Sequence, residues 1–80
     1  MSKMKVQYGG SQIVIEGEPP SLTVYVWDNQ ASSTSTIGHE TLPKTHVQTV
    51  EEAKQRAIAA IASERGMPEE TVRRDLDGRW

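Results

Sequence analysis

The chain has 80 residues, no cysteine and a formal net charge of −2, and 35% of its residues are hydrophobic. This length predicts one domain with a small core, which would gain stability from a partner or as a homodimer. The composition excludes disulfides and thiolate metal sites, and the negative charge does not favour general binding to polyanions. No apolar run approaches the roughly 20 residues of a membrane span or resembles a signal peptide, so we expect a cytoplasmic protein away from membranes.

Lysine and arginine are absent between Val6 and Pro43. The charged residues of this stretch are all acidic, and they are Glu16, Glu18, Asp28 and Glu40. The gap predicts a surface patch that is acidic, polar and aromatic, and such a patch suits a protein partner better than a nucleic acid.

The first 20 residues predict a β-hairpin. Residues 4–8 alternate between apolar and polar side chains, the period of a half-buried strand. Gly9-Gly10 is a two-residue turn signal, and residues 12–16 form the returning strand. Residues 17–20, Gly-Glu-Pro-Pro, should end that strand because proline cannot donate to a β-ladder.

Residues 22–27 predict the strongest strand, which Asp28-Asn29 should end. Alternation directs Leu22, Val24 and Val26 to one face and Thr23, Tyr25 and Trp27 to the other. The Ser/Thr-rich segment that follows leaves two alternatives open, since residues 34–39 could form a fourth strand or a mobile loop. Leu42-Pro43-Lys44 predicts another break.

Two helices are expected after this break. Thr49 and Glu52 have the spacing of a capping box, and the helix should run from there to Arg65, with Gly66 as its terminator. Pro68 suits the first turn of a short second helix that ends near Leu76. The expected fold is one α+β domain over residues 1–80. A three- or four-stranded antiparallel sheet packs one face on a main helix of about residues 49–65, and a helix of about residues 68–76 follows.

Residues 61–76 have the layout of a helix-turn-helix, with a small alanine before a glycine turn. Their end, Glu-Glu-Thr-Val-Arg-Arg-Asp-Leu, resembles the recognition helix of DeoR-type repressors. That resemblance implies a small DNA-binding transcriptional regulator with Thr71, Arg73 and Arg74 at the DNA. A plainer interpretation pairs each arginine with the glutamate four residues before it, at positions 69 and 70.

Aromatic side chains supply the other candidate site. If the main helix covers the Leu22 face, Tyr25 and Trp27 stand on the open face, in reach of Tyr8. Exposed aromatic residues of this kind anchor protein interfaces. They also stack on single-stranded nucleic acid, but that function needs interleaved lysine or arginine, which this segment lacks. If the faces are reversed, the same rings belong to the core.

The sequence predicts no metal site, no cofactor and no enzyme. His39 and His46 lack further zinc ligands at a suitable spacing, so we interpret them as loop histidines. Phosphate-binding and nucleophile motifs are missing from the sequence. Glu16 and Glu18 lie two residues apart at a strand end, where solvated carboxylates are more common than an acid–base pair.

The sequence therefore favours a non-enzymatic protein-binding module that contacts a larger protein or protein complex. The expected binding residues are Tyr25, Trp27, Asp28, Glu16 and Glu18. In size, acidity and ββα plan the chain is similar to small anti-defence proteins of phages, such as anti-CRISPR inhibitors. That resemblance implies an inhibitor that binds a CRISPR–Cas complex, and it does so by occlusion, because four acids imitate the charge of DNA poorly.

Overall fold

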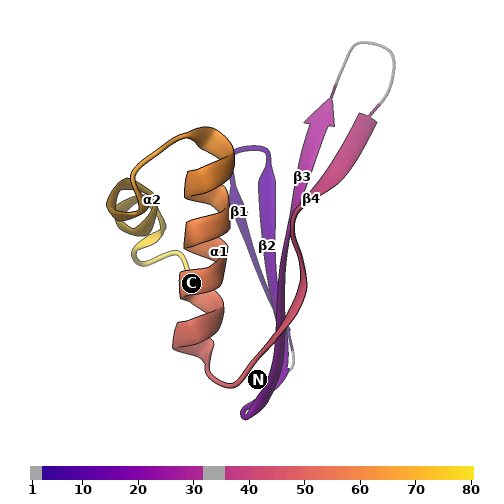
Figure 1. The fold of residues 1–80 in the computed structure, drawn as a ribbon, viewed down its shortest axis with the longest axis vertical. Helices are drawn as coiled ribbons and strands as arrows, with labels where there is room; N and C mark the ends of the chain where they lie inside the picture. Colours follow the sequence, from indigo (N-terminus) through magenta and orange to yellow (C-terminus); the bar gives the residue numbers. More distant parts are fainter. Residues whose placement is uncertain (1–2, 32–35) are drawn as a thin grey trace.

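Four antiparallel strands form one sheet in the order β1-β2-β3-β4, and two helices follow them in the chain (Figure 1). The computed structural model describes residues 3–31 and 36–80, and its side chains are described for residues 3–28 and 39–80. The elements are β1 (Lys3–Tyr8), β2 (Ser11–Glu18), β3 (Ser21–Ala31), β4 (Thr36–Val47), α1 (Val50–Arg65) and α2 (Glu69–Leu76). The predicted α+β class is confirmed, and the sheet has four strands.

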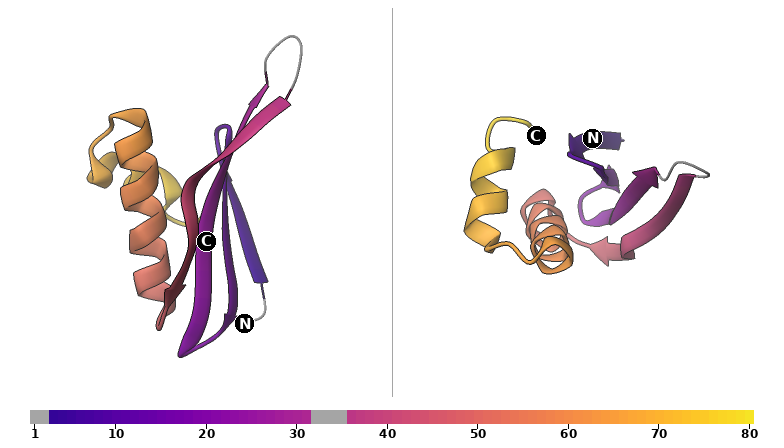
Figure 2. Two further views of the ribbon diagram at one scale, coloured as in Figure 1. Left: turned by 45° about the vertical axis from the view of Figure 1, so that its right-hand side comes forward. Right: turned by 90° about the horizontal axis from the view of Figure 1, so that it is seen from above.

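Helix α1 covers one face of the sheet, and α2 packs on the side of α1 that is turned away from the sheet (Figure 2). After α2 the chain returns to the edge strand β1, where the Arg79 guanidinium donates to the Gln7 carbonyl oxygen at 2.6 Å. The opposite face of the sheet carries no helix in the described part of the chain, and we call it the open face.

The core lies between the sheet and α1, as the alternation of β3 predicts. Side chains with no exposed surface come from β2, β3 and both helices, and they include Ile13, Ile15, Leu22, Val24, Val26, Ile61, Val72 and Leu76. Buried alanines of α1 lie between these larger side chains and let the helix approach the sheet closely. The predicted inward face of β3 is therefore confirmed.

The predicted strand ends are partly wrong. Gly17 and Glu18 belong to β2, and the turn lies at Pro19-Pro20. Asp28-Asn29 does not end β3, which continues to Ala31 because β4 supplies pairing partners for residues 29–31, beyond the last pair with β2 at Asp28. The segment Leu42-Pro43-Lys44 lies inside β4, which is an edge strand and therefore tolerates a proline without an N–H donor.

A register irregularity accommodates this proline. Val24 pairs with Thr45, whereas Val26 pairs with Leu42, so β4 contributes extra residues on one side of the ladder. Of the segment left open between strand and loop, the residues from Thr36 onward form β4, and residues 32–35 lie outside the described ranges.

The helix boundaries follow their predicted signals. The Thr49 hydroxyl accepts a hydrogen bond from the Glu52 amide at 3.1 Å, which confirms the N-cap of α1. Gly66 ends α1 in the left-handed conformation, with φ of +64°. Pro68 is the N-cap of α2 rather than a residue of its first turn.

Tyr8 does not lie on the open face. Its ring is buried with the core, because it follows Met4 and Val6 on the inward side of β1. Its hydroxyl donates to Asp75 Oδ2 at 2.6 Å, and the Arg65 guanidinium lies 5.1 Å from the ring centre. The hydrogen bond to Asp75, followed by burial and the charge of Asp75, raises the pKa of Tyr8 above its ordinary value of 10.0, and Arg65 partly opposes this change.

We expect the hydrogen bond between Tyr8 and Asp75 to make the folded state less stable in strong alkali. Because folding raises the pKa of Tyr8, the folded state holds the phenol proton more tightly than the unfolded chain. The resulting stabilisation is complete below pH 10.0 and is lost as the pH rises through the raised pKa. Tyr8→Phe should cost about 1–2 kcal/mol at neutral pH and should make the alkaline loss smaller.

Urea unfolding at neutral pH and at about pH 11 tests this prediction. Tyr25→Phe is the matched control, because its ring lies on the open face, and it should keep the alkaline loss of the wild type. An equal alkaline loss in Tyr8→Phe and in the wild type would show that Tyr8 does not cause it.

Candidate protein-binding face

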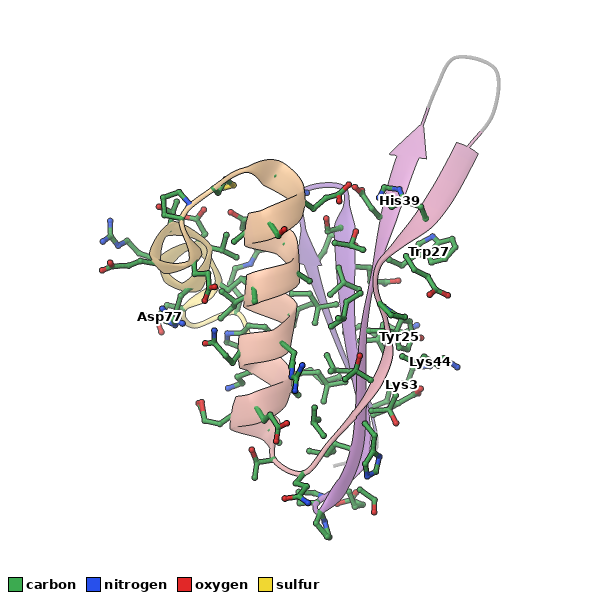
Figure 3. All side chains as sticks on the ribbon, viewed as in Figure 1. Lys3, Tyr25, Trp27, His39, Lys44 and Asp77 are labelled. Carbon is green, nitrogen blue, oxygen red and sulfur yellow. The ribbon has the colours of Figure 1, made fainter. Side chains whose placement is uncertain are left out.

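The open face consists of three cross-strand rows. Pairing registers and alternation place these residues together, as Lys3–Glu16–Thr23–His46, Lys5–Val14–Tyr25 and Gln7–Gln12–Trp27–Glu40. Figure 3 shows the labelled side chains Lys3, Tyr25, Trp27 and Lys44 on the side of the sheet away from α1. The prediction that β3 turns its aromatic side chains away from the main helix agrees with this arrangement.

Tyr25 and Trp27 are half-buried in neighbouring rows of this face. Val14, directly opposite Tyr25 on β2, keeps only 1% of its surface exposed although it is on the face without a helix. Lys44 Nζ lies 5.5 Å from the centre of the Tyr25 ring, within range of a cation–π interaction. The centre of the open face is therefore a patch of aromatic and aliphatic side chains, with Lys44 beside the Tyr25 ring.

The predicted acidic character of this patch is wrong. Strand pairing brings Lys3 and Lys5 from β1 beside the cation-free strands, and Lys44 arrives from β4. Lys3 Nζ and a Glu16 carboxylate oxygen are 3.9 Å apart across the β1–β2 pair. The rim of the open face carries both signs of charge, because residues far apart in the sequence become neighbours in the sheet.

The three predicted acidic binding residues, Asp28, Glu16 and Glu18, do not all lie beside Tyr25 and Trp27. Asp28 lies on the α1 side of the sheet and keeps 6% of its surface exposed, so it does not share the open face with Trp27. Alternation already indicated this, since Asp28 shares the inward face with Val26. Glu18 is exposed at the end of β2, and Glu16 is half-buried within the open face.

The segment resembling a helix-turn-helix forms the last turn of α1, the turn at Gly66 and α2. Arg73 donates to Gln55 Oε1 at 2.7 Å, and Gln55 donates to Glu69 Oε1 at 2.8 Å. Gln55 therefore stands between the arginine and the glutamate predicted to pair directly.

The predicted pair Arg74–Glu70 is confirmed, with its charged atoms 3.6 Å apart. Thr71 is half-buried, and both arginines are exposed. Each residue of the candidate DNA-binding set thus lies on α2, and its two arginines lie beside polar or acidic partners.

The histidines are strand residues, so their interpretation as loop residues is wrong. His39 and His46 both belong to β4, on opposite faces of the sheet. His39 Nε2 is 3.0 Å from Glu64 Oε1 of α1. Asp28 is its cross-strand neighbour on β3, and sequence spacing gave no indication of this convergence.

Comparison with protein families, curated proteins and solved structures gives no match, so function has to be inferred from the surface of this chain. Within the described ranges, neither helix is long and apolar enough to cross a membrane.

Proposed function

We propose that this protein is a non-enzymatic binding module whose open face contacts a larger protein or protein complex. The observation that carries the proposal is the half-buried pair Tyr25 and Trp27 on a sheet face that no helix of the described chain covers. Tyrosine and tryptophan are enriched among the residues that dominate binding energy at protein interfaces. Because both side chains are already half-buried, they lose less rotamer freedom on binding than fully exposed side chains would.

The charges around the two rings favour a protein over a nucleic acid as the partner. The lysines of the open face, Lys3, Lys5 and Lys44, are balanced by the acids Glu16 and Glu40 in the same rows and Glu18 at the edge. Binding of single-stranded nucleic acid needs a continuous positive groove beside the stacking rings. A rim of mixed sign around an apolar centre is the usual anatomy of a protein interface.

For the partner class, the resemblance in size and plan to phage anti-defence inhibitors supports a large host complex, such as a CRISPR–Cas assembly. The module would act by covering a working surface of that complex. Charge imitation of DNA is a weaker explanation, because the lysines of the open face offset its acids.

Trp27→Ala should weaken capture of the partner by at least about tenfold, as expected for an aromatic anchor near the centre of an interface. The measurement is a pulldown from the native host with tagged full-length protein, quantified by mass spectrometry and followed by titration of the recovered partner. Trp80→Ala is the matched control, because its indole packs against the core near Lys54 rather than on the open face. Equal retention of one partner by wild type and Trp27→Ala would contradict the proposal.

A gel-shift assay tests the alternative function, a DNA-binding regulator that uses residues 61–76. If α2 binds DNA, the variant that combines Arg73→Ala with Arg74→Ala loses a gel shift that the wild type shows at about 50 mM salt. The binding-module proposal expects no gel shift from any of these proteins. It also expects partner capture by the double-arginine variant at the wild-type level.

A further inference from the structure

Three potential metal ligands from three different elements meet on the α1 side of the sheet. They are Asp28 of β3, His39 of β4 and Glu64 in the last turn of α1, and one ligand atom from each lies within 4.8 Å of the others. One of these separations, between His39 Nε2 and Glu64 Oε1, is 3.0 Å. Figure 3 shows His39 directed from β4 toward the side of the helix, opposite to Trp27.

We propose that Asp28, His39 and Glu64 bind a divalent transition metal ion, with Zn²⁺ as the best fit. One imidazole nitrogen and two carboxylate oxygens form a three-ligand set that leaves the fourth tetrahedral position open to water or another ligand. Ca²⁺ prefers six to eight oxygen ligands, and Mg²⁺ prefers octahedral oxygen sites, so neither suits a set with an imidazole.

The separations suit the bond lengths that zinc requires. Zinc bonds of about 2.0–2.2 Å place tetrahedral ligand atoms roughly 3–4 Å from one another. One observed separation is 3.0 Å and none exceeds 4.8 Å, so the three ligand atoms lie close enough to share one ion. The His39 and Glu64 side chains are 43% and 41% exposed, which leaves an entry path for the ion.

Asp28 supplies a second, independent reason for a cation at this position. The residue keeps only 6% of its surface exposed, and no lysine or arginine among the described residues forms an ion pair with it. The nearby Arg65 guanidinium donates instead to the Tyr8 carbonyl oxygen and to Ser11 Oγ, both at 3.0 Å. A buried carboxylate is costly without a compensating charge, which a bound cation would provide.

The backbone also prepares the site. Asp28 and His39 are direct cross-strand partners in the β3–β4 pair, so the sheet fixes their spacing before any ion binds. Glu64 is in the last turn of α1, where the negative end of the helix dipole attracts cations. A bound ion would therefore link both strands of the β3–β4 hairpin to the end of α1. The site and Trp27 are on opposite faces of the sheet, so this proposal does not depend on the proposed function.

Isothermal titration of chelator-treated full-length protein with ZnCl₂ tests the proposal. We expect one equivalent of Zn²⁺ per chain, and a Co²⁺ titration should give the visible absorption bands of a four-coordinate site. His39→Ala should weaken Zn²⁺ binding by at least about tenfold. His46→Ala is the matched control, since this second histidine lies on the open face, and it should bind Zn²⁺ like the wild type.

A second pair of variants separates ligation from general surface charge. Glu64→Gln should also weaken Zn²⁺ binding and reduce the Zn²⁺-induced rise in melting temperature, whereas Glu40→Gln should change neither. Both positions are exposed, so the variants should fold. The proposal is overturned if wild-type protein binds no Zn²⁺, if His39→Ala and Glu64→Gln bind as tightly as wild type, or if His46→Ala loses binding equally.

Discussion

Ile61→Ala is expected to lower the free energy of unfolding by about 2–5 kcal/mol. Ile61 of α1 belongs to the hydrophobic core and has no exposed surface. Alanine would leave a cavity there that the β-sheet is too rigid to close. Because small domains are stable by only about 5–15 kcal/mol, this single change removes a large share of the total.

Urea unfolding followed by circular dichroism measures the effect. Ile61→Val is the control of similar shape, and it should cost only about 0.5–1.5 kcal/mol. The slope of the unfolding free energy against urea concentration should be the same for all variants. A constant slope shows that the substitution changes stability rather than the compactness of the folded or unfolded state. An alanine variant as stable as the valine variant would mean that α1 is not seated on the sheet as described.

Gly17→Ala is the second change with a large expected effect. Gly17 has φ of +104° within β2, and a Cβ atom added there would lie 2.5 Å from the Ser21 carbonyl oxygen. Both the left-handed backbone and the contact with the main chain oppose a side chain. We expect a loss of at least about 2 kcal/mol in unfolding free energy.

Gly78→Ala separates the two causes of this loss. Gly78 also has positive φ, +82°, but a Cβ atom there meets nothing within 4 Å. That variant should cost only the conformational strain, about 1 kcal/mol. Chemical unfolding of both variants under identical conditions gives the comparison, and similar losses at the two positions would show that the contact with Ser21 relaxes freely.

Local patterns were sufficient to predict the two faces of β3 and the positions of both helices. Leu22, Val24 and Val26 alternate cleanly, and Thr49 and Gly66 mark the ends of α1 by their own hydrogen bonding and backbone conformation. The same alternation places Tyr8 with Met4 and Val6, and Asp28 with Val26, so local sequence encodes the inward position of both residues.

Other differences between the sequence-based predictions and the structure arise from contacts between distant parts of the chain. Pro43 is an obstacle in a central strand but not in an edge strand, and the edge position of β4 follows only from the assembled sheet. Lys3, Lys5 and Lys44 reach the aromatic face through pairing between distant segments. His39 meets Glu64 across 25 positions of sequence. No local spacing rule encodes such neighbours, so the charge distribution of the open face and the contact between His39 and Glu64 could not be inferred from local patterns.

The order of the elements has a consequence for biosynthesis. All four strands precede α1, and each pairs with the strand next to it in sequence. The whole sheet therefore leaves the ribosome before the helix that covers its apolar face. During that interval Ile13, Ile15 and Leu22 would face water or any nearby nascent chain. The newborn polypeptide is therefore most vulnerable to aggregation just before residues 50–65 emerge, and chaperone binding would matter most at that moment.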